Sequence, residues 1–327
     1  MTNLYTDKRT LVTGGLGFIG SNLAIRLVKL GADVEIFDAL IPDMGGNKFN
    51  IEPVKKDVKV TIGDLRDEGK IAKAVRGKDI IFNLAGTLSH IDSMENPFSD
   101  LDINCRAQLQ LLEACKKLNR GVKIIYAGTR NQYGKAKYLP VDENHPLEPT
   151  DINGVNAIAG EKYHLMYDKV YGIGAVSLRM TNTFGPRHQM KHSKQGVLNW
   201  FLRQIIDGET IKLMGGGGQI RDINYIDDVV RALILAGASK NANGQVYNLG
   251  GSALSLLEFS KKAINILGRG NTRNIDFPKD RKNIEVGDYI ADYKKITKDL
   301  GWEPKTSIDE AIKKTFGYYK RYKKYYW

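Results

Sequence analysis

The sequence predicts an α/β fold: a doubly wound parallel sheet followed by a smaller C-terminal α/β domain. Two observations lead to this prediction. Short apolar strand patterns alternate with amphipathic helix patterns through the first half of the chain, and a βαβα order requires right-handed crossovers between parallel strands. The strand patterns are also apolar on both faces, as in FNLAG at residues 82–86. Such strands are typical of a sheet that helices cover on both sides.

Each element of the first half follows from its residue pattern. Runs of β-branched and aromatic residues bounded by turn residues predict strands, and apolar residues spaced three and four apart predict helices. The expected strands cover residues 9–13, 33–38, 58–62, 79–84, 122–127 and 174–180. The expected helices cover residues 21–30, 68–75, 98–118 and 154–170.

The pattern loosens after Met180 into loops rich in glycine, proline and histidine, and the smaller domain begins there. Ser307 and Glu310 have the spacing of a capping box at the start of the last helix. Helices are expected at 197–206, 226–238, 254–267, 292–300 and from 307 onward, with a strand at 245–249. We therefore expect a sheet domain at 1–180 with a return segment at about 224–252, and a second domain at 181–223 and 253–327.

Composition and charge place the chain among globular proteins. Its 327 residues suggest two domains or one large doubly wound unit, and 42% hydrophobic with 26% charged residues exclude a disordered chain. Lys and Arg (49) outnumber Asp and Glu (37), which gives a net charge of +12. That charge favours anionic partners without choosing among nucleic acid, membrane and phosphorylated metabolites.

Neither secretion nor membrane insertion is expected, because no basic and apolar leader opens the chain and no run approaches roughly 18 apolar residues. Cys105 and Cys115 fall in one expected helix about 15 Å apart, so they cannot bridge, and a cytoplasmic location is expected. Basic and aromatic residues alternate over 313–327. We expect a terminal helix that docks its rings on the body, and we expect no nucleic-acid or membrane partner.

A glycine-rich turn, GGLGFIG at residues 14–20, links the first expected strand to the first expected helix. Gly14 allows the tight turn, Gly17 lets the backbone approach a pyrophosphate, and Gly20 permits close helix packing. The helix N-terminus, with Phe18 and Ile19, supplies amide donors.

Two acidic residues extend this pattern. Asp38 ends the second expected strand, 18 residues after Gly20, where its carboxylate would accept both ribose hydroxyls and repel a 2′-phosphate. Asp64, beside Leu65, follows the third strand and either accepts the adenine amino group or simply forms a turn. The sequence therefore predicts a Rossmann-type domain that binds NAD in preference to NADP.

With these residues the chain resembles the extended short-chain dehydrogenase/reductase family, in its nucleotide-sugar epimerase/dehydratase branch. The similarity covers nearly the whole chain. It includes the glycine turn, GDL at 63–65, NLAG at 83–86, SMENP at 93–97, Asn104, AGTRNQYG at 127–134, LRMTNTFGPR at 178–187 and GGQIRDINYIDDVV at 217–230.

The resemblance implies roles for residues at matching positions. Leu84, Ala85, Gly86 and Asn104 would line the cofactor, and Thr129 would hydrogen-bond the substrate hydroxyl that is oxidised. Asn182 and Arg221 would hold the substrate pyrophosphate, because a planar guanidinium forks well onto phosphate oxygens. Alternatively, Arg221 pairs with a nearby acid such as Asp222. The remaining expected substrate contacts are Arg130, Arg187 and Val197, and no metal ligand set is expected.

The chain departs from the family at the catalytic pair. Aligning the helix that contains Gly160 and Glu161 puts Asn153 at the position of the family's tyrosine and Ala157 at that of its lysine. Neither an amide nor a methyl group can accept a proton at neutral pH, and a lost general base costs on the order of 10² to 10⁴ in rate.

Other residues are candidates for the missing base. His90 follows the fourth strand at the edge where ligands of open α/β sheets bind, so it is one candidate, although it could also be a loop histidine bonded to backbone. Tyr133 is another, although it could pack under its loop. His164 lies eleven residues from Asn153, about 16 Å along the helix, and is too far away.

The expected function is NAD-dependent oxidation of a nucleotide-activated sugar by hydride transfer, alone or followed by epimerisation. Elimination of water is disfavoured because family dehydratases carry Asp and Glu where this chain has Arg130 and Asn131. Three alternatives stay open: a binding protein that lost turnover, an engineered chain in which Ala157 replaces lysine, and a 4,6-dehydratase. The resemblance also implies a homodimer through helices 98–118 and 154–170.

Overall fold

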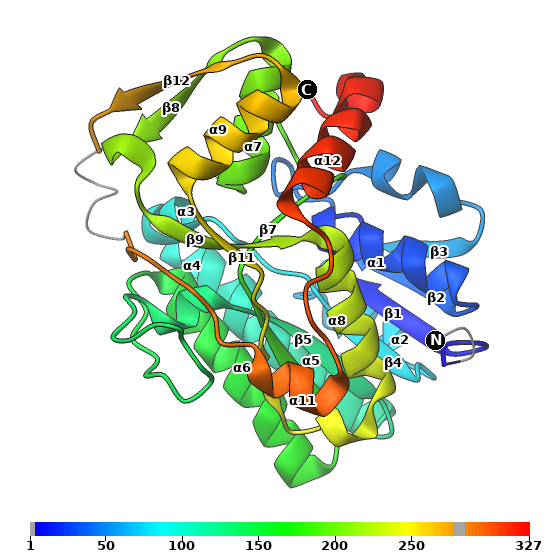
Figure 1. Cartoon of the computed structure of the whole chain (residues 1–327). Helices are drawn as coiled ribbons and strands as arrows, with labels where there is room; N and C mark the ends of the chain where they lie inside the picture. Colours follow the sequence, from blue (N-terminus) through cyan, green and yellow to red (C-terminus); the bar gives the residue numbers. More distant parts are fainter. Residues whose placement is uncertain (1–3, 278–284) are drawn as a thin grey trace.

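The computed structural model describes residues 4–277 and 285–327 and is built on a seven-stranded parallel sheet with helices on both faces (Figure 1). In spatial order the strands are β10 (Val246–Asn248), β6 (Ala175–Met180), β5 (Lys123–Thr129), β4 (Ile80–Asn83), β1 (Arg9–Thr13), β2 (Asp33–Asp38) and β3 (Val58–Ile62). The predicted doubly wound sheet is confirmed. The chain reverses direction across the sheet between β1 and β4, and a crevice forms at such a switch point.

Alternate residues of the central strands enter two different cores, which explains why the strands are apolar on both faces. Val12, Phe82 and Ile125 pack with α1 (Phe18–Lys29) and α8 (Ile226–Ala238) on one face. Their neighbours in sequence pack on the other face against α2 (Glu68–Ala74), α5 (Ala107–Leu118) and α6 (Ile152–Tyr171).

The long helix expected at 98–118 is interrupted. It consists of α4 (Pro97–Leu101), a π-helical turn η2 (Asp102–Arg106) and α5, and it is preceded by the short α3 (His90–Glu95), which the sequence did not predict. Asn104 lies in the wide turn, where its amide group exchanges hydrogen bonds with the backbone of Thr87. The irregular turn therefore ties this helix to the loop after β4.

The smaller lobe contains α7 (Val197–Asp207), α9 (Leu256–Leu267) and α12 (Ile308–Tyr322). A three-stranded sheet, β11 (Ser252–Ser255), β9 (Ile220–Tyr225) and β7 (Asn182–Phe184), and a parallel pair, β8 (Thr210–Met214) and β12 (Asn271–Ile275), complete it. The helix α11 (Lys294–Leu300) packs near β10. Short 3₁₀ turns are η1 (Lys48–Val54), η3 (Arg130–Tyr133), η4 (Gly215–Gly217), η5 (Lys240–Ala242) and η6 (Lys323–Tyr325).

The C-terminal segment docks as the sequence predicted. Ser307 Oγ accepts the N–H of Glu310 at the start of α12. The rings of Tyr319 and Tyr326 are buried, and the indole N–H of Trp327 donates to Asp207 at 3.1 Å. Both cysteines are free. Within the described ranges, no helix combines the length and the apolar character that crossing a membrane requires.

Candidate active site

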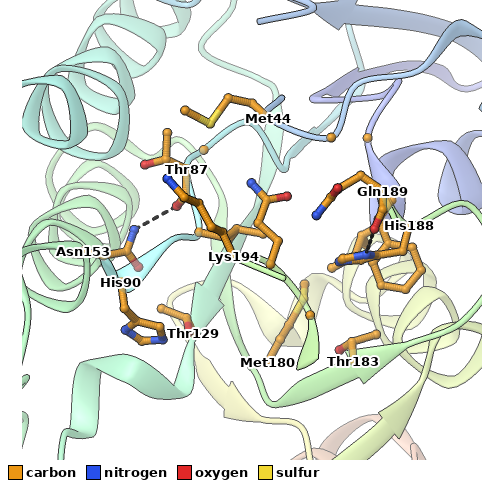
Figure 2. A pocket seen from close by; sticks show the side chains of 18 of the residues that line it. Met44, Thr87, His90, Thr129, Asn153, Met180, Thr183, His188, Gln189 and Lys194 are labelled. Carbon is orange, nitrogen blue, oxygen red and sulfur yellow. Dashed lines mark hydrogen bonds between the residues drawn. The ribbon is translucent and has the colours of Figure 1, made fainter. Parts of the chain in front are cut away.

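A single cavity of about 830 Å³ brings the predicted site residues together (Figure 2). Its walls come from the loops after β1, β4 and β5 and from β7, β9 and α7 of the smaller lobe. The predicted cofactor residues that line it are Gly14, Gly17, Phe18, Ile19, Gly20, Asp38, Asp64, Leu65, Leu84, Ala85, Gly86 and Asn104. The other predicted residues that line it are His90, Thr129, Arg130, Asn153, Ala157, Asn182, Val197 and Arg221.

The glycine turn has the geometry that a closely approaching ligand needs. Gly14 has φ +64°, and its N–H donates to the carbonyl of Phe37 at 2.8 Å. A Cβ at Gly20 would lie 2.3 Å from the carbonyl oxygen of Gly14, so only glycine lets α1 start this close to β1. Gly17 caps α1 without any side-chain hydrogen bond, and the first turn of the helix lines the cavity. Its amide groups and positive dipole end suit an anionic group.

Asp38 and Asp64 have different surroundings at this end of the cavity. Asp38 accepts the N–H groups of Leu16 at 2.9 Å and Leu40 at 2.8 Å, and burial raises the pKa of its carboxyl. These bonds hold the carboxylate and still leave lone pairs for hydroxyl donors. Asp64 is paired through both oxygens with the guanidinium of Arg66, which lowers its pKa. It also accepts the backbone N–H of Arg66, so the turn-forming alternative has direct geometric support.

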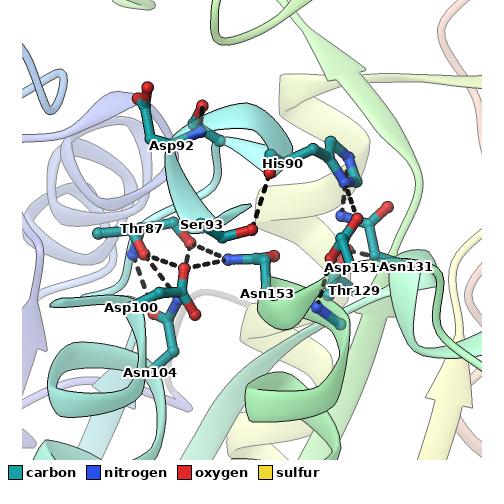
Figure 3. A network of polar contacts seen from close by, with 12 residues as sticks. Thr87, His90, Asp92, Ser93, Asp100, Asn104, Thr129, Asn131, Asp151 and Asn153 are labelled. Carbon is teal, nitrogen blue, oxygen red and sulfur yellow. Dashed lines mark hydrogen bonds and ion pairs between the residues drawn. The ribbon is translucent and has the colours of Figure 1, made fainter. Parts of the chain in front are cut away.

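Asn153, which we expected from the resemblance at the position of a catalytic tyrosine, belongs to a polar network (Figure 3). Its amide donates to the carbonyl of Thr87 at 2.8 Å and to Asp100 at 3.0 Å. The Asp100 carboxylate is 3% exposed and also accepts the amides of Asn104 and Asn156. Asn153 thus links α6 to α4 by donating hydrogen bonds from its neutral amide group, and this group cannot serve as a proton acceptor.

His90 stands at the start of α3 between two partners (Figure 3). Its Nε2 lies 3.1 Å from the amide nitrogen of Asn131, which can only donate, so Nε2 accepts. Nδ1 then carries the proton and donates to the carboxylate of Asp151. Asp151 is held in turn because its other oxygen caps α6 at the N–H of Gly154, 2.7 Å away. Thr129 is adjacent, and its Oγ1 accepts the N–H of Asn131.

The arginines Arg221 and Arg187 have different hydrogen-bond partners from those expected. Arg221 donates to Glu285 at 2.5 Å and to the carbonyl of Gly287 at 2.6 Å, so its acidic partner is Glu285 and the Asp222 pairing considered from the sequence is wrong. Asp222 instead accepts two backbone N–H groups, and burial raises its pKa to about 6. The substrate contact expected for Arg187 finds no support, because its guanidinium donates to Asn22 at 2.8 Å and does not line the cavity.

The structure also bears on Tyr133, the second candidate base, and on His164, which the sequence excluded. Tyr133 is fully buried and donates to Asn248 at 2.7 Å outside the cavity, as packing under its loop predicts, and burial raises its pKa to about 12. His164 is buried against Asn83 and does not line the cavity, which agrees with its exclusion.

Sequence reasoning did not identify Asp151 and Lys194. In the sequence, Asp151 has only the features of an ordinary helix N-cap residue, and only the fold brings its carboxylate to His90. Lys194 lies in the loop before α7, and Figure 2 shows it between Thr87 and Gln189. It reaches across the cavity to pair with Asp92 at 2.6 Å.

The fold and the cavity define a Rossmann-type enzyme with a dinucleotide turn and a polar substrate end. The model of the GDP-mannose 4,6 dehydratase family matches residues 11–315, and the chain belongs to this family of nucleotide-sugar epimerase and dehydratase enzymes. It is 31% identical to the UDP-glucose 4-epimerase of Mycolicibacterium smegmatis, covering 95% of this chain and 98% of the relative.

Two solved structures share the architecture. The UDP-glucose 4-epimerase of Thermotoga maritima with UDP-glucose is 30% identical, has a TM-score of 0.88 and covers 96% of this chain and 99% of its own. The dTDP-glucose 4,6-dehydratase DesIV of Streptomyces venezuelae, with NAD and TYD bound, is 26% identical with a TM-score of 0.87, covering 97% and 98%.

Proposed function

We propose that this chain uses NAD to oxidise a hydroxyl group of a nucleotide-activated sugar, alone or as the first step of an epimerisation, with His90 as the general base. One observation carries the proposal: His90 lines the same cavity as the dinucleotide turn and Thr129, and its ring is bonded to the buried carboxylate of Asp151. A histidine oriented by a carboxylate is a recurring arrangement for proton abstraction.

The residues present fit NAD. A Cβ at Gly86 would lie 2.8 Å from the amide oxygen of Asn104, so the loop after β4, which lines the cavity, packs closely on Asn104 at this glycine. The uncapped start of α1 would hold the pyrophosphate, and Asp38 would accept the ribose hydroxyls. When bound, NAD supplies the acceptor for the hydride that leaves the sugar carbon. Relatives whose structures hold NAD support the same assignment.

The chain's own residues then manage the proton. Thr129 Oγ1 orients the reacting hydroxyl, and Nε2 of His90, the nitrogen not protonated in this tautomer, takes its proton once the substrate displaces Asn131. Asp151 stabilises the imidazolium that results, because it is already bonded to Nδ1. Arg221 and Asn182 would hold the pyrophosphate at the other lobe. Epimerisation requires that the oxidised sugar turn before the hydride returns, and a cavity of about 830 Å³ has room for that rotation.

A second candidate function is a nucleotide-sugar and NAD-binding protein without turnover. Asn153 and Ala157 favour it, because one is bound into the Asp100 network and the other brings no charge to the cavity. Dehydration is less favoured: of the two side chains after Thr129, Arg130 is cationic and Asn131 bonds His90, so neither offers an acid or base for elimination.

The test follows NADH absorbance with UDP-, GDP-, CDP- and dTDP-sugars, coupled to product analysis for epimers. We expect turnover by the native chain, a loss of about 10² to 10⁴ in kcat for His90→Gln, and a smaller loss for Asp151→Asn. Asp151→Asn should lower kcat and leave the KM for the nucleotide sugar within about twofold, because Asp151 contacts His90 and not the substrate; a purely structural role would change both.

Other results would argue against His90 as the general base. Equal turnover by the native chain and His90→Gln would remove His90 from the mechanism. A silent native chain that gains turnover in Ala157→Lys would support the binding protein, because the lysine that the family carries would then be what is missing. Tight binding of NAD and a nucleotide sugar by calorimetry in every variant would show that these substitutions leave the fold intact.

We also propose a homodimer. Large apolar side chains stand exposed on α4 and α6, which belong to the helices that the resemblance places at a twofold interface, and on the neighbouring α3; a second copy of the chain would cover them. These side chains are Met94 (50% exposed), Phe98 (76%), Leu101 (41%), Val155 (51%), Met166 (39%) and Val170 (59%).

A further inference from the structure

Arg130 is a buried cation that pairs with no anionic side chain among residues 4–277 and 285–327. It begins η3 directly after Thr129, its side chain lines the cavity, and the residue is only 8% exposed. Its Nη1 atom has no hydrogen-bond partner among the described residues. A buried guanidinium that lacks hydrogen bonds is costly, because every N–H removed from water must be satisfied elsewhere.

The surroundings of Arg130 do not neutralise it. Its guanidinium stacks over the ring of Tyr289, 5.4 Å from the centroid. Burial, together with the like charge of Arg221, lowers the pKa of Arg130 to about 10, so it remains charged at neutral pH. The two nearby carboxylates are engaged elsewhere: Glu285 with Arg221, and Asp222 with the N–H groups of Gly251 and Ala291.

Resting on the proposed function, we propose that Arg130 binds a carboxylate on the sugar, so that the substrate is a nucleotide-activated acidic sugar. The position of Arg130 favours a ligand group on the sugar, since Arg130 directly follows the threonine that orients the reacting hydroxyl. The in-plane edge of a guanidinium stacked on an aromatic ring presents parallel N–H donors, which match the two coplanar oxygens of a carboxylate.

The alternative source of negative charge is the substrate diphosphate, which every nucleotide sugar carries. Arg221 and Asn182 already face that group in the proposed arrangement, and Arg221 keeps donors beyond those used on Glu285 and the carbonyls of Ile220 and Gly287. The two sources predict different responses to Arg130 variants. A phosphate ligand affects all nucleotide sugars alike, whereas a carboxylate ligand affects only the acidic ones.

Calorimetry in the presence of NAD makes this comparison. UDP, GDP, CDP and dTDP are titrated first, and the tightest selects a matched pair of neutral and acidic sugars, which for UDP are UDP-glucose and UDP-glucuronate. The native chain should bind the acidic sugar at least tenfold more tightly than the neutral one. Arg130→Gln should abolish that preference and leave the affinities for the free diphosphate and the neutral sugar within about twofold.

A matched control and a second measurement complete the test. Arg120→Gln removes the same charge at an exposed site, where the side chain donates to the carbonyl of Lys116, and it should keep the preference. Without ligand, Arg130→Gln should unfold at the same temperature as the native chain or higher, because an unsatisfied buried charge is removed; a lower Tm would assign Arg130 to the fold.

Two results would overturn the carboxylate. One is a native chain that binds both sugars equally. The other is an Arg130→Gln variant that weakens the diphosphate, the neutral sugar and the acidic sugar by one common factor, which would make Arg130 a phosphate ligand. If none of the nucleotides binds, the proposed function itself is overturned. A separate measurement of NAD binding distinguishes that result from a failure of the carboxylate proposal alone.

Discussion

Arg179 of β6 and Glu161 of α6 form a buried ion pair that joins the sheet to this helix. Their side chains are 3% and 0% exposed and meet through two bonds, Nε to Oε2 at 2.9 Å and Nη2 to Oε1 at 2.5 Å. Ser177 and Tyr133 occupy further donor and acceptor positions of the pair. A buried ion pair contributes little beyond an apolar replacement, but removing one partner leaves a charge without compensation.

We therefore expect Glu161→Gln to lower the free energy of unfolding by about 3 to 5 kcal/mol, because the Arg179 guanidinium would stay buried and unpaired. Guanidinium chloride unfolding measures the change. Glu310→Gln is the control: Glu310 pairs with Lys314 at 2.7 Å on the surface, where 51% of its side chain is exposed. That substitution should cost less than about 1 kcal/mol. Equal losses in the two variants would contradict the argument.

Single residues also show where sequence reasoning ends. His90 could be identified because a histidine after a β-strand stands at the ligand-binding edge of the sheet. Asp151 could not, because its partner lies 61 residues away and only the packing of α3 on α6 brings the two together. The same applies to Arg221: its neighbour in sequence is Asp222, yet Glu285 is its partner across 64 residues.

At the scale of elements, the junction of β1 and α1 carries the dinucleotide turn. Gly20→Ala would put a methyl group 2.3 Å from the Gly14 carbonyl and 2.7 Å from the Cα of Gly15, so α1 must move away from the turn. We expect the affinity for NAD to fall at least tenfold, since the amide donors move with the helix. Gly121→Ala is the control, because its Cβ would meet nothing within 4 Å. Calorimetry with NAD that shows no difference between the two variants would contradict this role for the turn.

Elements with a strong apolar pattern were predicted from the sequence, and elements without one were not. β1, β2 and α8 have the bounds expected, because each buries a regular set of apolar residues. β3 also has the bounds expected, although none of its residues is buried. Two strands of the smaller lobe, β12 and β11, were missed because they are short or polar: β12 reads NTRNI and β11 reads SALS. Pairing with β8 and β9, and not an apolar period, decides that these segments are strands.

At the scale of the whole molecule, one core crosses from the sheet to the smaller lobe. Val12 and Phe82 of the sheet belong to the same cluster as Leu202, Phe259 and Ile312 of the lobe. The two walls of the cavity are therefore parts of one packed body, and the turn that would hold the dinucleotide and the arginines that would hold the substrate keep a defined relation.

The apolar face on α3, α4 and α6 is the surface through which we propose that two copies of the chain associate. Phe98 is 76% exposed, more than any other of the apolar side chains named on this face, and a second copy that covers it would remove its ring from water. We expect the native chain to sediment as a dimer at micromolar concentration and Phe98→Glu to sediment as a monomer, since each copy would have to bury a carboxylate in the apolar interface. The monomer should still bind NAD, because no predicted cofactor residue lies on that face. Ile62→Glu, at 45% exposure on the edge strand β3, tests another exposed apolar site. If this variant dissociates the dimer and Phe98→Glu does not, the subunits meet through the sheet edge and the helical face is free.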